Sequence, residues 1–153
     1  MLVFPNQQVT FLSDGGDTVR DLQLYLNPQA EHVLDWFHVT MRLTVMGQMV
    51  KGVRSEEYTN IAEDASKQLE RIKWYLWHGN VFRALQIVDY LATDIEFIEE
   101  SDAQRKLLKA LRDFEHYITV NKPFIPNYGD RYRNGENIAT GFVESTVDRK
   151  SVV

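Results

Sequence analysis

Gln8-Val9-Thr10-Phe11-Leu12-Ser13-Asp14-Gly15-Gly16 is the stretch from which the fold can be read. Its first six residues are rich in β-branched and aromatic side chains, and the run stops at an aspartate and two glycines. A strand over 8–13 that ends in a turn is therefore predicted. Asp17-Thr18 can then cap a helix with apolar residues at helical spacing, which Asn27-Pro28 ends.

A second short apolar run, His32-Val33-Leu34-Asp35-Trp36-Phe37, again predicts a strand. A helix with one apolar face follows it, because Val39, Leu43, Met46 and Val50 recur at helical spacing. The order strand, helix, strand implies a parallel pair with a right-handed crossover. Reactive groups gather beyond the carboxyl ends of such strands. We therefore expect Asp14, at the end of the first strand, and Asp35, near the end of the second, to be neighbours in space.

Both aspartates also have structural explanations. Asp14 precedes two glycines, which is typical of a turn residue, and Asp35 can cap the helix that begins near Val39. Asp35 lies inside an apolar run, where an unpaired carboxylate is costly, so it needs a cation, a histidine or a backbone N–H as partner. His38, three residues further on, is a candidate for that partner.

Residues 55–121 predict three consecutive amphipathic helices joined by short turns, which is a small helical bundle. Gly79 stands where the first of these helices ends, and Ser101-Asp102 caps the third. No residues in this segment have catalytic spacing. The dense aromatic cluster Trp74-Tyr75-Leu76-Trp77-His78 fits packing in a core better than stacking on unpaired bases.

The segment 122–135 carries the longest loop signal in the chain, with two prolines, two glycines and two asparagines. It interleaves Arg131 and Arg133 with Tyr128 and Tyr132. Arginines placed between aromatic residues suit a phosphate backbone with a base or sugar nearby. The alternative is a solvated loop whose tyrosines fold back on the core.

A last helix is predicted over 136–147, with Ile138, Ala139 and Phe142 toward the core. Glu144 falls on its opposite, more polar side. From there Glu144 faces either solvent or a site at the edge of the sheet.

The composition is that of a folded domain: among 153 residues, 44% are hydrophobic and 25% are charged, which excludes disorder as the default. The chain has no cysteine, so disulfides and thiolate zinc sites are excluded. It has no membrane-spanning run and no signal peptide, so a cytoplasmic protein is expected. The net charge of -5 argues against a free-standing nucleic-acid binder. However, the deficit lies in 56–121, with 13 acidic and 8 basic residues, and the rest of the chain is balanced.

Six short stretches, taken in order, resemble the catalytic core of bacterial insertion-sequence transposases, in particular the ISKra-type group. They are Leu12-Ser13-Asp14-Gly15-Gly16, Leu34-Asp35-Trp36-Phe37-His38, Met41-Arg42-Leu43-Thr44, Trp74-Tyr75-Leu76-Trp77-His78-Gly79-Asn80, Asn127-Tyr128-Gly129-Asp130-Arg131-Tyr132-Arg133 and Phe142-Val143-Glu144-Ser145-Thr146. The resemblance runs from about Gln7 to Val147. This family belongs with the DDE transposases related to the Mutator group.

The resemblance implies a mixed α/β, mostly helical fold, in which a partial RNase H-like core is interrupted by an all-helical insertion. Residues 1–54 would form the β-α-β-α part of that core. Residues 55–121 would form the insertion, and 122–153 the loop and the helix that carries the catalytic glutamate.

The resemblance also implies a metal site. Asp14 matches the second catalytic aspartate of the family and Glu144 its catalytic glutamate, so these two residues would bind Mg²⁺ or Mn²⁺. Such carboxylate oxygens suit Mg²⁺, which usually takes one or two of them and keeps several waters. Asp35 remains the alternative to Asp14 as the second metal-binding aspartate.

Supporting and DNA-binding roles follow from the same resemblance. Asp35 and His38 match a Cys/Asp-x-x-His motif and would form a supporting pair. Four residues of the loop would contact DNA: Arg131, Arg133, Tyr128 and Tyr132. The partners would be the DNA of the transposon's terminal repeats and of its target, with several copies of the protein in one complex and no membrane.

The activity implied is metal-dependent DNA cleavage and strand transfer. The family's first catalytic aspartate and earlier strands would precede this chain and a basic stretch would follow it, so we expect a fragment, truncated at both ends, that does not catalyse transposition alone. The alternative is a catalytically inactive remnant or a small regulator that binds DNA or transposase. A weaker option is a helical interaction domain whose carboxylates are all structural.

Overall fold

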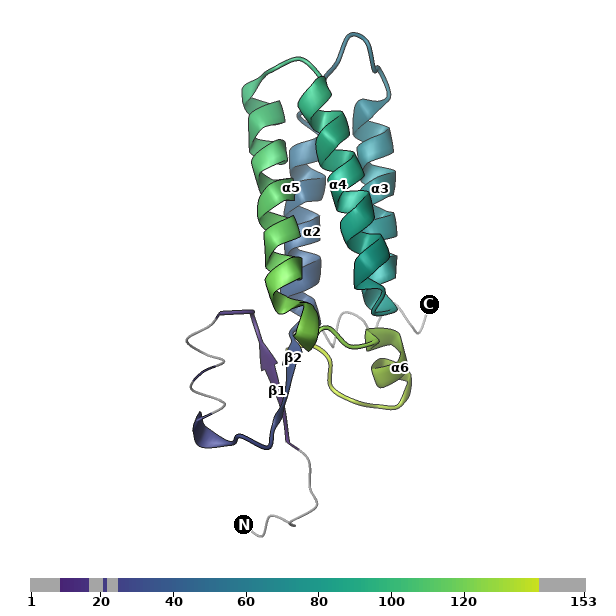
Figure 1. Cartoon of the computed structure of the whole chain (residues 1–153). Helices are drawn as coiled ribbons and strands as arrows, with labels where there is room; N and C mark the ends of the chain where they lie inside the picture. Colours follow the sequence, from purple (N-terminus) through teal and green to yellow (C-terminus); the bar gives the residue numbers. More distant parts are fainter. Residues whose placement is uncertain (1–8, 17–20, 22–24, 141–153) are drawn as a thin grey trace.

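The fold is a two-stranded parallel sheet placed at one end of a four-helix bundle (Figure 1). It is seen in a computed structural model, which describes residues 9–16, 21 and 25–140. The predicted class, mixed α/β and mostly helical, is confirmed.

The two strands are β1 (Thr10–Ser13) and β2 (Glu31–Leu34), and they run parallel as predicted. Their register pairs Thr10 with Glu31 at one end and Ser13 with Leu34 at the other. The helix predicted between the strands falls largely on residues outside those described. β2 is shorter than predicted, because the chain turns into a helix directly after Leu34.

Helix α2 (Trp36–Val50) begins two residues after β2 ends. The prediction of a strand through Trp36 and Phe37 was therefore wrong, and the helix starts earlier than the predicted Val39. The reason is the cap: the Asp35 side chain accepts a hydrogen bond from the Phe37 N–H at 3.0 Å. Trp36 is then the first of the buried residues on the apolar face of α2.

Three further helices complete the bundle, and their buried positions agree with the predicted apolar faces. They are α3 (Ile61–Trp77), α4 (Val81–Phe97) and α5 (Asp102–Asn121). As predicted, Gly79 follows the end of α3, with a φ of 73° that favours glycine, and Ser101 caps α5. Within the described part of the chain, no helix is long and apolar enough to cross a membrane.

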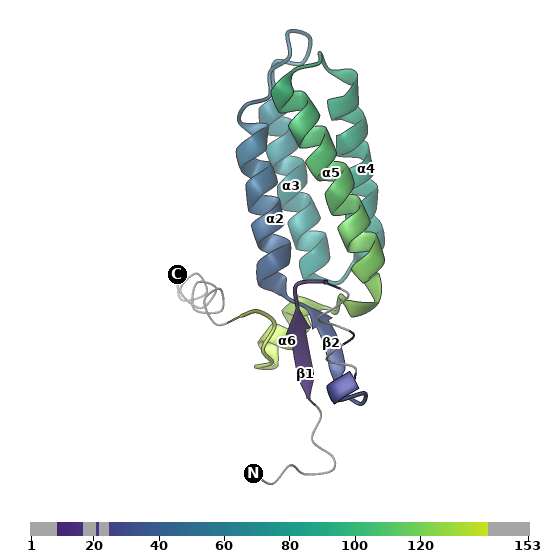
Figure 2. The ribbon, with the colours of Figure 1, turned by 90° about the vertical axis from the view of Figure 1, so that its left-hand side faces the viewer.

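Helix α2 is the fourth member of this bundle. It packs between α3 and α5, and α4 closes the ring by packing against both of those helices (Figure 2). Packing thus joins α2 to helices that the sequence assigns to a separate insertion. The proposed division of the chain at residues 54 and 121 stays a prediction.

The segment predicted as a loop contains a 3-10 turn, η1 (Lys122–Phe124), and a short helix, α6 (Tyr128–Arg133). The loop prediction was therefore wrong for these residues. Asn127 caps α6 by accepting a hydrogen bond from the Asp130 N–H at 3.1 Å. Helix α6 lies at the same end of the bundle as the strands (Figures 1 and 2).

The start of the last predicted helix was also wrong, because residues 136–140 have no helical structure. Their backbone groups bond to the β2–α2 junction instead. Ile138 accepts a hydrogen bond from the Trp36 N–H at 3.0 Å, and the Thr140 N–H donates to Asp35 at 3.2 Å. Ile138 and Ala139 are buried by this arrangement. The remainder of that predicted helix, with Glu144, lies outside the described residues.

Candidate functional site

Asp14 and Asp35 occupy equivalent places at the carboxyl edge of the sheet. Each directly follows its strand, and the residues before them, Ser13 and Leu34, are register partners. The Asp35 N–H extends this pairing by donating to the Ser13 carbonyl at 2.7 Å. The prediction that the two aspartates meet at one edge agrees with this geometry.

The two carboxylates differ in their surroundings. Asp14 is exposed, and within the described residues its carboxylate accepts one hydrogen bond, from the Gly16 N–H at 2.9 Å. Asp35 is 2% exposed and accepts hydrogen bonds from the Phe37 and Thr140 backbones. Asp14 is therefore available to a ligand, whereas Asp35 already holds together a strand, a helix and a distant segment.

His38 does not provide the partner predicted for Asp35. Its Nδ1 atom is buried, and no described residue forms a hydrogen bond with it. Backbone N–H groups at the start of α2 take that role, because a carboxylate at a helix N-terminus is stabilised by unpaired N–H groups and by the helix dipole.

The end of α5 adds residues that the sequence did not predict. The Tyr117 hydroxyl donates to the backbone carbonyl of Asp14 at 3.3 Å, and the Arg42 guanidinium carbon lies 3.8 Å from the centre of the Tyr117 ring. Burial raises the pKa of Tyr117 to about 12; the charges of Asp14 and Asp35 act in the same direction, and Arg42 opposes them. The Tyr117 hydroxyl thus lies beside Asp14, the residue that directly follows β1.

Gly15 is the residue that lets α5 approach this edge. Its φ is 94°, and a Cβ atom there would lie 2.9 Å from the Asn121 amide nitrogen and 3.1 Å from the Tyr117 ring. A side chain at residue 15 would therefore force the Asn121 and Tyr117 side chains to shift. The sequence held only a weak indication of this contact, namely that Tyr117 and Asn121 continue the apolar face of α5 although both are polar. They lie about 100 residues from the turn that they cover.

The oxygen ligands at this edge of the sheet are part of what a divalent metal ion needs. Asp14 offers an exposed carboxylate, the kind of oxygen ligand that Mg²⁺ prefers. In the part of the chain that the structure describes, no group of three or more histidines and carboxylates could hold a metal ion. Further ligands would have to come from waters and from residues outside that part, of which Glu144 is the predicted one.

Helix α6 departs from the DNA-contacting loop predicted there. Tyr128 is fully buried, and its hydroxyl donates to the Leu34 carbonyl at 2.6 Å, so this side chain is in the core and cannot contact DNA in this fold. Tyr132 is half-buried against Trp77. Both arginines are paired with carboxylates, Arg131 with Glu31 and Glu136, and Arg133 with Asp130.

A Tyr128→Phe variant tests the structural role of this tyrosine. The Leu34 carbonyl would lose its buried partner, so the free energy of unfolding should fall by about 1–3 kcal/mol, as measured by urea denaturation. Tyr90→Phe, at a side chain that is 60% exposed, is the control and should change it by under ~0.5 kcal/mol. If the folded Tyr128→Phe variant instead lost affinity for DNA, that result would support the predicted contact between Tyr128 and DNA.

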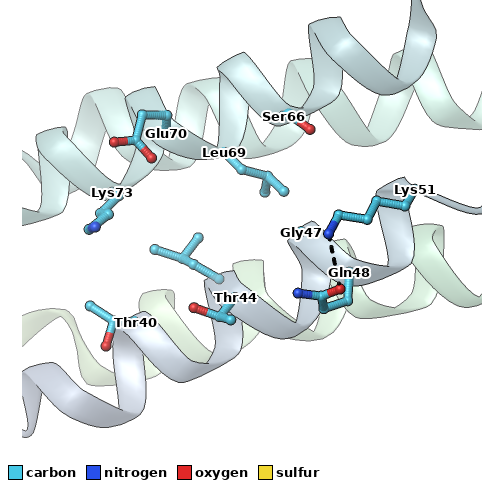
Figure 3. A pocket seen from close by; sticks show the side chains of 10 residues that line it. Thr40, Thr44, Gly47, Gln48, Lys51, Ser66, Leu69, Glu70 and Lys73 are labelled. Atoms are coloured by element: carbon cyan, nitrogen blue, oxygen red, sulfur yellow. Dashed lines mark hydrogen bonds between the residues drawn. The ribbon is translucent and has the colours of Figure 1, made fainter. Parts of the chain in front are cut away.

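A polar groove of about 300 Å³ lies between α2 and α3. Figure 3 shows threonine and serine hydroxyls, two lysines and one acid along it. That acid, Glu70, accepts a hydrogen bond from the Trp74 indole at 2.9 Å. With a single carboxylate, already engaged, the groove is a poorer candidate for metal-dependent chemistry than the strand edge.

Comparison with known proteins gives one finding. The family model DDE_Tnp_ISL3, described as a transposase, matches residues 6–81, about half of the chain. No curated protein and no solved structure matches significantly. The matched residues include the strand edge with Asp14 and Asp35 and the first half of the bundle, and this match supports a transposase.

Proposed function

We propose that this chain carries catalytic-core residues of a DDE transposase of the insertion-sequence type, which cleaves DNA and transfers strands with a divalent metal. The single observation that carries the proposal is the transposase family match over residues 6–81, which contains both aspartates of the strand edge. The exposed carboxylate of Asp14 at that edge supports the metal-dependent part.

In this proposal Asp14 and Glu144 hold Mg²⁺ or Mn²⁺. When bound, the metal supplies activation of an attacking oxygen and stabilisation of the leaving oxygen in phosphoryl transfer. Asp35 caps α2, and its N–H holds the backbone next to Asp14 by donating to the Ser13 carbonyl. His38 supplies a half-buried imidazole in the first turn of that helix. Arg133, the more exposed of the two arginines of α6, is kept as a DNA contact. Arg131 and Tyr132 position the helix.

The parallel strands at the base of a helical bundle are compatible with an RNase H-like core that holds a helical insertion. The ISKra-type, Mutator-related grouping rests on the six sequence stretches that carry the resemblance. The partner is DNA, in a complex of several copies, and the expected compartment is the cytoplasm.

Fluorescence anisotropy of a labelled DNA duplex tests this function, with titrations in Mn²⁺ and in EDTA. We expect binding that is about tenfold tighter in Mn²⁺, since a metal held by Asp14 would contact a phosphate. Equal affinity in both buffers would overturn the metal site and support a DNA-binding regulator. Absence of binding in both would overturn DNA as the partner.

A further inference from the structure

We propose that Arg42 forms a phosphate-binding site for a DNA strand at the carboxyl edge of the sheet, with Tyr117 as its positioning residue. This inference rests on the proposed function, because it supplies a contact for the same substrate at the same edge. Neither residue was predicted from the sequence to have this role.

Arg42 is exposed on α2, and no described carboxylate pairs with it. Four other arginines, Arg105, Arg112, Arg131 and Arg133, each form an ion pair. Arg54, Arg71 and Arg83 form none with a described residue, but each donates to a carbonyl or amide oxygen nearby. The Arg42 guanidinium therefore has N–H donors left for an external anion.

Tyr117 holds that guanidinium in place. The Arg42 guanidinium carbon lies 3.8 Å from the ring centre, within the range of a cation–π contact. The ring itself is 7% exposed, and its hydroxyl is bonded to the Asp14 backbone. A chain of contacts thus links Arg42 to the residue after β1, and orienting a guanidinium in advance reduces the entropy lost when it binds a phosphate.

The surroundings of Arg42 suit a nucleotide rather than a bare anion. A hollow of about 240 Å³ between α2 and α5 includes Arg42 in its wall, and its other walls are mainly apolar, from Met41, Val45 and Phe114. The one carboxylate among its lining residues, Asp113, is paired with Lys109 at 2.6 Å. Met41 and Val45 are 44% and 48% exposed. A phosphate on the guanidinium would place the adjoining sugar or base next to this apolar surface.

The test is DNA binding in EDTA, where a metal at Asp14 plays no part. Arg42→Gln should weaken binding of a labelled DNA strand about tenfold, the loss expected for a charge-assisted contact. The slope of log affinity against log salt should become shallower by about 0.7 to 0.9, the contribution of one phosphate. Arg71→Gln is the matched control: it removes the same charge from an exposed site on α3 and should change neither quantity as much.

Tyr117→Leu gives a second readout, provided that circular dichroism shows a folded bundle. Loss of the ring should weaken DNA binding in EDTA, although the charge of Arg42 remains. If Arg42→Gln binds DNA as the parent does, this inference is wrong while the proposed function stands. If the parent protein itself does not bind DNA, the proposed function fails with it.

Discussion

Alanine in place of Asp35 is expected to lower the free energy of unfolding by about 2–4 kcal/mol, because it removes a helix cap and a second hydrogen bond to the same charged group. The side chain is 2% exposed and accepts from the Phe37 N–H at 3.0 Å and the Thr140 N–H at 3.2 Å. Both donors would lose their partner, and α2 would lose its link to the segment around Thr140. Urea denaturation followed by circular dichroism measures the change.

Asp35→Asn separates the hydrogen bonds from the charge. Asparagine keeps an acceptor oxygen and caps helices about as well as aspartate, so this variant should lose less than ~1 kcal/mol. If asparagine proves as destabilising as alanine, the negative charge and not the cap is what this position requires. If alanine itself changes stability by under ~0.5 kcal/mol, the Asp35 cap is not the reason that α2 starts at Trp36.

The parts of the fold that the sequence predicts are those set by local pattern. Strand-like runs before Asp14 and Asp35, with one helical segment between them, were enough to predict a parallel pair and a shared edge. Apolar residues at helical spacing, with a glycine after α3 and a serine before α5, were enough for the helices of the bundle. In each case the residues that decide the structure are close together in the chain.

The errors arise where contacts between distant residues decide the local structure. Residues 138–140 belong to a segment whose apolar residues have helical spacing. Their backbone groups nevertheless bond to Trp36 and Asp35, about 100 positions earlier. The resemblance assigned Tyr128 a DNA contact, but the alternative, a tyrosine that folds back on the core, is correct for this residue, because its hydroxyl donates to the carbonyl that ends β2. The contact of Tyr117 with the turn at Asp14 also joins residues that are far apart in the chain. It requires the glycine at residue 15.

Asparagine in place of Asp14 is expected to weaken Mn²⁺ binding by at least about tenfold, since it replaces a charged ligand by a neutral amide at an equivalent position. Paramagnetic broadening of backbone amide signals in nuclear magnetic resonance spectra measures this without DNA and without catalysis. In the parent protein, Mn²⁺ should broaden the signals of residues 13–16. It should spare the turn at 98–101, which lies at the opposite end of the bundle (Figure 1).

The comparison of Asp14→Asn with Asp35→Asn decides which aspartate binds the metal. Asp14 is exposed, with one backbone hydrogen bond from a described residue, so its loss should remove the broadening and leave stability nearly unchanged. Asp35 is buried and engaged by two N–H groups, so Asp35→Asn should retain the broadening at residues 13–16. The reverse pattern would make Asp35 the metal ligand and Asp14 a turn residue. Broadening that survives both substitutions would place the metal away from this edge and overturn the proposed site.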